Sequence, residues 1–145
     1  MFVETWLLRR SIATVPEMHE LLRGCYERFS IDPATAFCLD LAAEEVFTNL
    51  VRHNRSDEKF VTMTVECTPQ EVHLQWIDRG VPRFEPSAEQ LAVDVTRPIS
   101  QRRPGGLGLH LTRSVVDALT FGYENGDMTV GVVKRLGSDR EETVK

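Results

Sequence analysis

The segment over residues 34–53 constrains the fold of this chain more than any other part of the sequence. Its spacing is helical, and its apolar residues occupy most of the helix circumference instead of one stripe. They are Phe37, Leu39, Leu41, Ala42, Val46, Phe47, Leu50 and Val51. A helix that is apolar nearly all round must be covered on several sides by other elements. Because Asp32-Pro33 is a helix start signal, the sequence predicts a central helix that begins here.

The rest of the chain supplies helices and strands to cover this helix. In chain order we predict a strand over 2–12, a helix over 16–29, strands over 61–67 and 72–77, a short helix near 87–94, a helix over 107–118, and strands over 119–124 and 128–136. Helices on one face of a mixed, mostly antiparallel sheet make a two-layer α/β sandwich of the α+β class. Strands and helices alternate too rarely for a doubly wound parallel sheet.

Length and charge restrict the function classes. A chain of 145 residues without a linker-like segment predicts a single domain over residues 1–145. Its 17 Lys and Arg against 22 Asp and Glu give a net charge of −5, so no general electrostatic attraction draws it to nucleic acid or anionic lipid. No apolar run approaches the roughly 20 residues of a membrane span, and the N-terminus is a poor signal peptide. We therefore expect a cytoplasmic protein without direct nucleic-acid or membrane contacts.

Cysteine and histidine spacing predicts no metal site made from these side chains alone. Cys25, Cys38 and Cys67 are widely spaced, so they are interpreted as free thiols among apolar residues. The four histidines show no metal-ligand spacing.

Three segments carry polar residues that point to chemistry, and the first lies on the central helix. Glu45 and Asn49 are four residues apart, so they share one stripe at the edge of the apolar face. A carboxylate and an amide turned inward need partners, because burying them unpaired is costly. Mg²⁺ and phosphate would supply such partners, with the Asn carbonyl oxygen as a metal ligand. A solvated polar stripe near the helix end explains the pair at least as well.

The other two segments lie at a strand end and at a helix start. The carboxylate of Asp78 can accept a hydrogen bond from an exocyclic amine, and Gly80 lets a planar ring come close. The alternative to such a ligand site is a plain Asp-Gly turn without a ligand. In residues 104–111 a glycine cluster directly precedes a helix. This arrangement is typical of an anion-binding site at a helix N-terminus, and a flexible loop is the alternative interpretation. The chain has no GxxxxGK[ST] motif, dinucleotide fingerprint or protein-kinase motif set.

The order and spacing of the three segments are more specific than any one of them. EEVFTN resembles the N box of the GHKL ATP-binding superfamily, DRGVPRFEP its first glycine box and GGLGLHLTRSVVDALTF its second. Within it, the chain is similar over nearly its whole length to small anti-sigma factor serine/threonine kinases. The resemblance implies a histidine-kinase-like (Bergerat) ATP-binding fold with a lid over about 83–104. One departure is Arg83, which separates Pro82 from Phe84 where the family commonly has Pro-Phe adjacent.

The resemblance also implies a role for each matching residue. Glu45 would be the general base, Asn49 would bind the Mg²⁺ that bridges the ATP phosphates, and Asp78 would accept a hydrogen bond from the adenine amino group. The other expected nucleotide contacts are Thr48 and Gly80 near the adenine, Gly105, Gly106, Leu107 and Gly108 around the phosphates, and Arg103 of the lid, with Arg97 and Arg102 as alternative lid arginines. The expected cofactors are therefore ATP and Mg²⁺.

Two functions of different kinds follow from the resemblance. The first is an anti-sigma regulatory factor: a protein serine/threonine kinase that phosphorylates an anti-anti-sigma antagonist of the STAS type and also sequesters a sigma factor. The second is a non-catalytic nucleotide-binding switch that controls a sigma factor or a phosphatase by binding alone, and a simple ATPase is a more remote third. The intact Glu45 favours the kinase, since a pure binder needs no base. Family members commonly dimerise, so the resemblance also suggests that this chain forms a homodimer.

Overall fold

The computed structural model describes residues 1–54, 56–81 and 106–137, without the side chains of residues 106–110. The elements in these ranges are, in chain order, β1 (Phe2–Arg9), a 3-10 turn (Ile12–Thr14), α1 (Val15–Arg28), α2 (Pro33–His53), β2 (Phe60–Cys67), β3 (Glu71–Asp78), α4 (Gly106–Val115), β4 (Ala118–Glu124) and β5 (Asp127–Arg135). The short helix expected near 87–94, the lid expected over 83–104 and the Arg83 departure lie outside the described residues.

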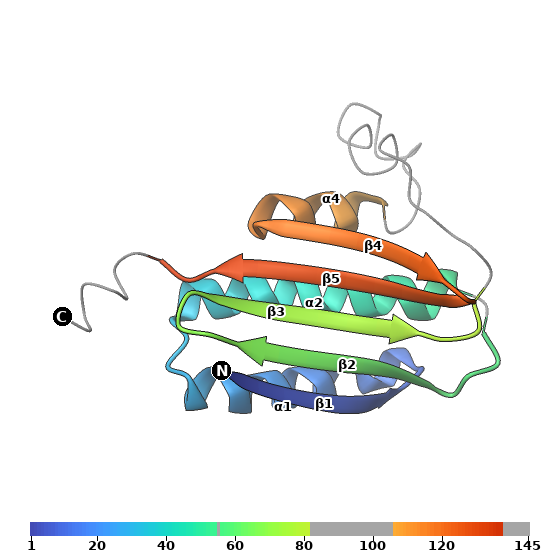
Figure 1. Ribbon diagram of the computed structural model, residues 1–145, viewed down its shortest axis with the longest axis horizontal. Coiled ribbons are helices and arrows are strands. Elements are labelled where there is room, and N and C mark those ends of the chain that lie inside the picture. Colours follow the sequence, from blue (N-terminus) through green and yellow to red (C-terminus); the bar gives the residue numbers. More distant parts are fainter. Residues whose placement is uncertain (55, 82–105, 138–145) are drawn as a thin grey trace.

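The five strands form one sheet in the order β1-β2-β3-β5-β4, and each neighbouring pair is antiparallel (Figure 1). In the described part of the chain the sheet is antiparallel throughout, where a mixed, mostly antiparallel sheet was predicted. Two helices link β1 to β2. The chain runs back along α1 and then returns along α2 to the end of the sheet where β1 finishes, so β2 starts there and runs antiparallel to β1. β3 and β4 do run in the same direction, but β5 lies between them and pairs with both.

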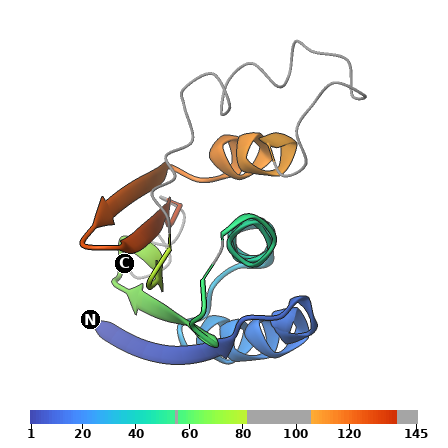
Figure 2. The ribbon, with the colours of Figure 1, turned by 90° about the vertical axis from the view of Figure 1, so that its right-hand side faces the viewer.

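The described helices α1, α2 and α4 cover the same face of the sheet, with α2 between the other two (Figure 2). This arrangement confirms the two-layer sandwich and the central position of the helix that starts after Asp32. The largest fully buried side chains include Phe47 of α2 and Trp76 of β3. On the other side of α2, the Tyr26 hydroxyl of α1 donates to Asp40 Oδ1 at 2.8 Å. Phe37 departs from the all-round burial, since it is 68% exposed.

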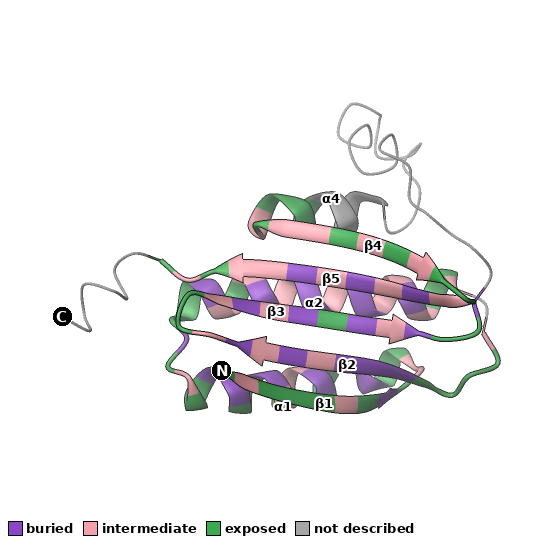
Figure 3. Cartoon of the chain, viewed as in Figure 1, coloured by how far each residue is buried: buried purple, intermediate pink, exposed green. Residues whose placement is uncertain are grey.

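The pleat of the strands decides which side chains face the helices. Buried residues alternate along β3, as Figure 3 shows, and the alternation of Trp76 and Asp78 carries a carboxylate into the interior at the strand end. Along β1 the buried residue is Leu8, and Arg10 is two positions further in the same phase. The strand ends thus place Arg10 and Asp78 on the helix-covered face of the sheet.

Two predicted boundaries were wrong, for local reasons. The first strand ends at Arg9 instead of residue 12, because the Ser11 side chain caps the 3-10 turn that follows. The helix α4 ends at Val115 instead of residue 118. Asp117 already belongs to the sheet, where its N–H donates to the Val133 carbonyl at 2.8 Å.

The turn between β4 and β5 and the three cysteines complete the description of the fold. Asn125 and Gly126 both have positive φ, 55° and 85°, as a tight hairpin turn between β4 and β5 requires. Cys25 and Cys67 are buried free thiols, and Cys38 is half-buried. Burial above all raises the pKa of Cys25 to about 11, so that thiol stays protonated at neutral pH. Within the described ranges, no helix has the length and apolar character to cross a bilayer.

Candidate functional site

The Asn49 side chain is held by its own helix in a defined orientation. Its Nδ2 donates to the Glu45 backbone carbonyl at 2.6 Å, and Thr48 Oγ1 donates to the same carbonyl at 3.3 Å. Because the amino end of the amide is used in this way, Oδ1 is the atom left for a ligand. No described residue donates a hydrogen bond to it. A carbonyl oxygen presented like this is a ligand type that Mg²⁺ accepts.

The Glu45 carboxylate is half-buried and has no hydrogen-bond donor among the described residues. Its pKa is raised above the ordinary Glu value, first by burial and then by the charge of Glu44, while Arg52 opposes the shift. A carboxylate with a raised pKa is a stronger base when it is ionised. A carboxylate with a raised pKa, at a depth that water and a ligand can still reach, is suited to accept a proton.

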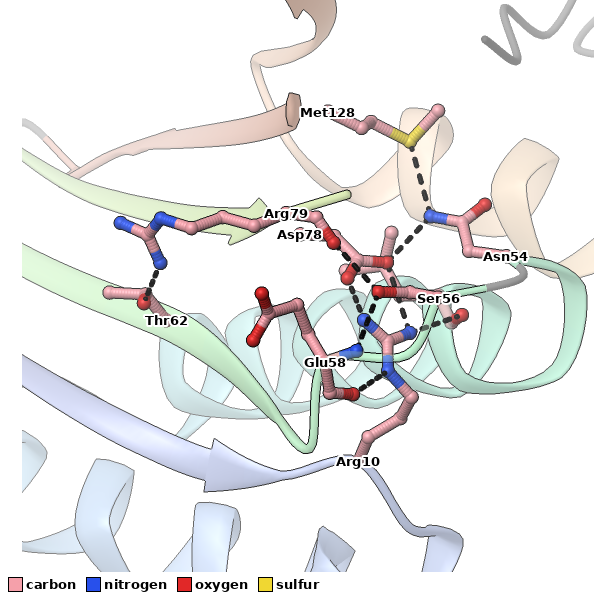
Figure 4. A network of polar contacts seen from close by, with 9 residues as sticks. Arg10, Asn54, Ser56, Glu58, Thr62, Asp78, Arg79 and Met128 are labelled. Atoms are coloured by element: carbon pink, nitrogen blue, oxygen red, sulfur yellow. Dashed lines mark hydrogen bonds and ion pairs between the residues drawn. The ribbon is translucent and has the colours of Figure 1, made fainter. Parts of the chain in front are cut away.

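Asp78 lies at the end of β3, fully buried, and accepts hydrogen bonds from two elements (Figure 4). The Arg10 guanidinium forms a two-pronged ion pair with it: Nη1 contacts Oδ2 at 3.1 Å, and Nη2 contacts Oδ1. Asn54 Nδ2 donates to Oδ2 at 2.7 Å and lies 3.5 Å from the sulfur of Met128. The carboxylate that sequence reasoning assigned to a ligand is therefore already held by two protein side chains.

Sequence reasoning missed both partners of Asp78. Asn54 directly follows α2 as its C-cap residue and was given no role. Arg10 was placed inside the first strand without a role. The available signal was the alternation of β1, since Trp6, Leu8 and Arg10 share one phase and face the helices.

Gly80 forms the turn after Asp78 and takes a conformation that favours glycine. Its φ is +66°, and a Cβ at this position would lie 3.8 Å from Ser56 Oγ and from Glu58 Cγ. Ser56 Oγ also donates to the Arg79 carbonyl at 2.7 Å, so the segment after α2 packs directly on this turn (Figure 4). The turn interpretation is correct. Gly80 is exposed at the same time, so a ligand can approach it.

The predicted phosphate-binding segment lies only partly within the described residues. Gly106, Leu107 and Gly108 form the first turn of α4, while Gly105 and Arg103 lie outside the described ranges. A helix of ten residues that begins on glycines offers unhindered backbone N–H groups at its N-terminus.

The chain enters the 82–105 segment from a fixed point. The Val81 N–H donates to the Gly126 carbonyl at 2.9 Å, and the Val81 carbonyl accepts from the Tyr123 hydroxyl at 2.8 Å.

The helix α2 brings the three predicted segments into one region. It packs against α4 and against β3, and Figure 2 shows it between α4 and α1 on the helix-covered side of the sheet. The Glu45 and Asn49 pair, the end of β3 and the glycine-rich start of α4 are therefore parts of neighbouring elements. These elements carry a half-buried carboxylate, an amide oxygen without a described donor, a fully buried carboxylate and a helix N-terminus, which are groups suited to a phosphorylated ligand that carries an amine.

Comparison with known proteins identifies the family. Residues 8–134 match the family model described as a histidine kinase-like ATPase domain. This chain belongs to that family. The GHKL resemblance drawn from the three boxes is confirmed, and membership implies nucleotide binding.

Individual relatives agree with this assignment. The chain is 30% identical over 92 residues to the serine/threonine-protein kinase BtrW of Bordetella bronchiseptica, a match that covers 62% of this chain and 63% of that protein. Its fold is similar to a structure of the RsbU and RsbW domains from Mycobacterium tuberculosis, with a TM-score of 0.69, 16% identity, and coverage of 94% of this chain and 33% of the other. It is also similar to the SiaB–SiaC complex from Pseudomonas aeruginosa, with a TM-score of 0.56, 12% identity, and coverage of 92% and 89%.

The residues present fit the ligand that the family implies. The Asn49 oxygen suits a divalent cation, and the Glu45 carboxylate has no described donor. Among the described residues, Asp78 receives three hydrogen bonds, from Arg10 and Asn54, of the about four that a carboxylate can accept. The fourth position would suit one N–H of an amine.

Proposed function

We propose that this chain is an anti-sigma regulatory factor of the kinase type, which uses ATP and Mg²⁺ to phosphorylate a serine or threonine of a STAS-type antagonist and also binds a sigma factor. The observation that carries the proposal is the Glu45 carboxylate. It is half-buried, has a raised pKa and lacks a described donor, one helical turn from an amide oxygen that is also free. A non-catalytic switch would have no use for such a group.

Each residue has a defined task in this proposal. Glu45 accepts the proton of the attacking hydroxyl and orients it. Asn49 would hold Mg²⁺ through Oδ1, and the metal would supply charge neutralisation at the phosphates. Asp78 accepts the hydrogen bond of the adenine amino group, with Gly80 and Thr48 beside the base.

The phosphates are assigned to the start of α4. Gly105, Gly106, Leu107 and Gly108 would contact them through backbone N–H groups, and Arg103 would approach from the lid. Phosphoryl transfer asks an enzyme mainly for positioning and charge stabilisation, which this set provides.

The partners are part of the proposal as well. The kinase name of the Bordetella relative supports phosphotransfer, although the match spans 63% of that relative's length and 33% of the Mycobacterium structure. Two similar structures are of RsbU and RsbW domains and of a SiaB–SiaC complex, which supports control by protein partners.

The first experiment measures nucleotide binding by calorimetry. Wild type is compared with Asp78→Asn and Asn49→Ala, each with ATP and ADP, with and without Mg²⁺. We expect micromolar, magnesium-dependent binding by wild type, loss of binding in D78N, and loss of the magnesium dependence in N49A. Asp57→Asn, at an exposed position on the neighbouring loop, is the control and should bind like wild type. If wild type bound neither nucleotide, the kinase and the switch would both be excluded.

The second experiment asks whether phosphate is transferred. Wild type and Glu45→Gln are incubated with Mg-ATP and candidate STAS-domain proteins, and phosphorylated residues are located by mass spectrometry. Serine or threonine phosphorylation by wild type alone supports the kinase. Nucleotide binding without transfer to any partner that forms a stable complex would favour the non-catalytic switch.

A further inference from the structure

The contacts of Arg10 are the most extensive polar network in the described part of the chain. Its Nε donates to the Glu58 carbonyl at 3.0 Å, and its Nη1 contacts the Leu50 carbonyl at 3.4 Å (Figure 4). The guanidinium also holds both oxygens of Asp78. Arg10 therefore connects the end of β1, the last turn of α2, the segment before β2 and the end of β3.

The backbone fixes this side chain at its root. The Arg10 N–H donates to the Lys59 carbonyl at 2.8 Å, which extends the pairing of β1 with β2 by one residue. The side chain is only 11% exposed, and burial lowers the pKa of Arg10, while Glu58 opposes the shift. A buried ion pair of this kind is costly to form and is weak evidence for stability alone, so its position needs another explanation.

The acceptor positions of Asp78 supply that explanation. Oδ2 accepts from Arg10 Nη1 and from Asn54 Nδ2, while Oδ1 accepts from Arg10 Nη2 alone among the residues that the structure describes. With about two acceptor positions on each oxygen, the free one lies on Oδ1. A two-pronged guanidinium contact also stops the carboxylate from rotating, because both oxygens are held in the plane of the fork.

We propose that Arg10 is a positioning residue of the nucleotide site: it fixes the Asp78 carboxylate so that a single acceptor position, on Oδ1, meets the exocyclic amino group of adenine. The inference rests on the proposed nucleotide binding and adds a residue that lies outside the three boxes. Arg10 acts through Asp78 and does not itself touch the nucleotide.

The test combines changes in the protein with a change in the ligand. Wild type, Arg10→Met and Arg10→Lys are titrated by calorimetry with Mg-ATP and with the Mg complex of purine riboside triphosphate, which lacks the amino group. If Arg10 acts through Asp78 on that group, R10M weakens ATP binding at least about tenfold, the usual range for one hydrogen bond to a charged group. Binding of the analogue should change by less than about twofold, since it has no bond to lose.

Two variants keep the test decisive. R10K retains the charge without the planar fork, so it should show the same selective loss of ATP binding to a smaller degree, even if R10M fails to fold. Arg9→Met removes a neighbouring exposed arginine and should leave both ligands unaffected. Thermal unfolding of each variant reports the structural contribution of the ion pair separately.

Three results would overturn the inference. If R10M and R10K weakened the binding of ATP and of the analogue equally, the role of Arg10 would be structural only. Unchanged ATP binding would remove its link to Asp78, and tighter ATP binding would mean that Arg10 competes with the base. All three presuppose that wild type binds ATP. Failure of wild type to bind ATP would reject the proposed function itself, so the two failures are distinguishable.

Discussion

At the scale of single residues, the polar groups of the candidate site differ in how many of their hydrogen-bonding positions have a described partner. Asp78 is fully paired on one oxygen and half-paired on the other, while Glu45 has no described donor. Asn49 directs its amino end to the α2 backbone, which leaves its oxygen free. Glu45 and Asn49 are partly exposed, so a ligand can reach the carboxylate of the first and the amide oxygen of the second.

The first prediction concerns the base. Glu45→Gln keeps the size of the side chain and removes its basicity, so phosphotransfer should fall by about a hundredfold to ten-thousandfold while the Kd for Mg-ATP stays within about twofold. Transfer by wild type should decline as the pH falls through the raised pKa of Glu45, because the base works only when ionised. Rate–pH profiles and calorimetry measure both effects. Transfer that persisted in E45Q would show that Glu45 is not the base.

The second prediction for Glu45→Gln concerns stability, which should rise although phosphotransfer falls. A carboxylate whose pKa is raised on folding destabilises the folded state as the pH rises from its unfolded pKa through its folded one. Gln carries no such cost at neutral pH, so E45Q should unfold at a higher temperature, by an increment on the order of 2 °C. Differential scanning calorimetry at pH 7 checks this. A lower unfolding temperature would indicate that the carboxylate has a stabilising partner.

At the scale of elements, α2 organises the molecule, and its N-terminus is well defined. The Asp32 side chain accepts the Thr35 N–H at 3.0 Å, and Pro33 occupies the first helical position. Hydrogen bonds from Thr35 lower the pKa of Asp32, since they favour its ionised form. The cap fixes where α2 starts, and α2 carries Glu45 and Asn49 and packs against α4.

Removal of this cap should destabilise the whole protein. Asp32→Ala is expected to lose about 1 kcal/mol in urea unfolding at pH 7, whereas Asp32→Asn, which can still cap, should lose little. Because the pKa of Asp32 is lowered in the fold, its contribution is present above the ordinary Asp pKa and disappears as the pH falls through the lowered value. The difference between wild type and D32A should therefore shrink on acidification. Equal stability at pH 7 would refute the role of the cap.

The β4–β5 hairpin gives a test of turn geometry. Gly126 has a φ of +85°, and its carbonyl holds the Val81 N–H at the start of the 82–105 segment. Gly126→Ala should lower the free energy of unfolding by about 1–2 kcal/mol, the cost of a left-handed conformation for an L-residue. Gly122→Ala on β4, where an added Cβ meets no atom within 4 Å, should be neutral or stabilising. The order of the two variants in urea unfolding decides the matter, and a G126A protein as stable as G122A would contradict it.

At the scale of the whole molecule, one layer of helices covers one face of an antiparallel sheet. The groups assigned to the ligand come from α2, β3 and α4, so a bound nucleotide would contact elements from both layers. Ligands that bind only the folded state raise its stability by mass action. Nucleotide binding should therefore be visible in global unfolding and not only at the site.

The corresponding prediction is a magnesium-dependent thermal shift. At a hundredfold excess over Kd, Mg-ATP should stabilise wild type by about 2.7 kcal/mol, with a clear rise in unfolding temperature. The shift should disappear in D78N, and in N49A it should be the same with and without Mg²⁺. D57N serves as the unaffected comparison. A shift of equal size in D78N would place the nucleotide elsewhere.

Sequence and tertiary structure each decided a separate part of this protein. The sequence alone determined the central helix, the strands and the three boxes on which the family resemblance rests, because helical periodicity, strand alternation and contiguous motifs are properties of neighbouring residues. It did not determine the fully antiparallel order with β5 between β3 and β4, or the pairing of Arg10 with Asp78. Those two residues lie 68 positions apart, so their ion pair exists only once β1, α2 and β3 have assembled at one edge of the sheet.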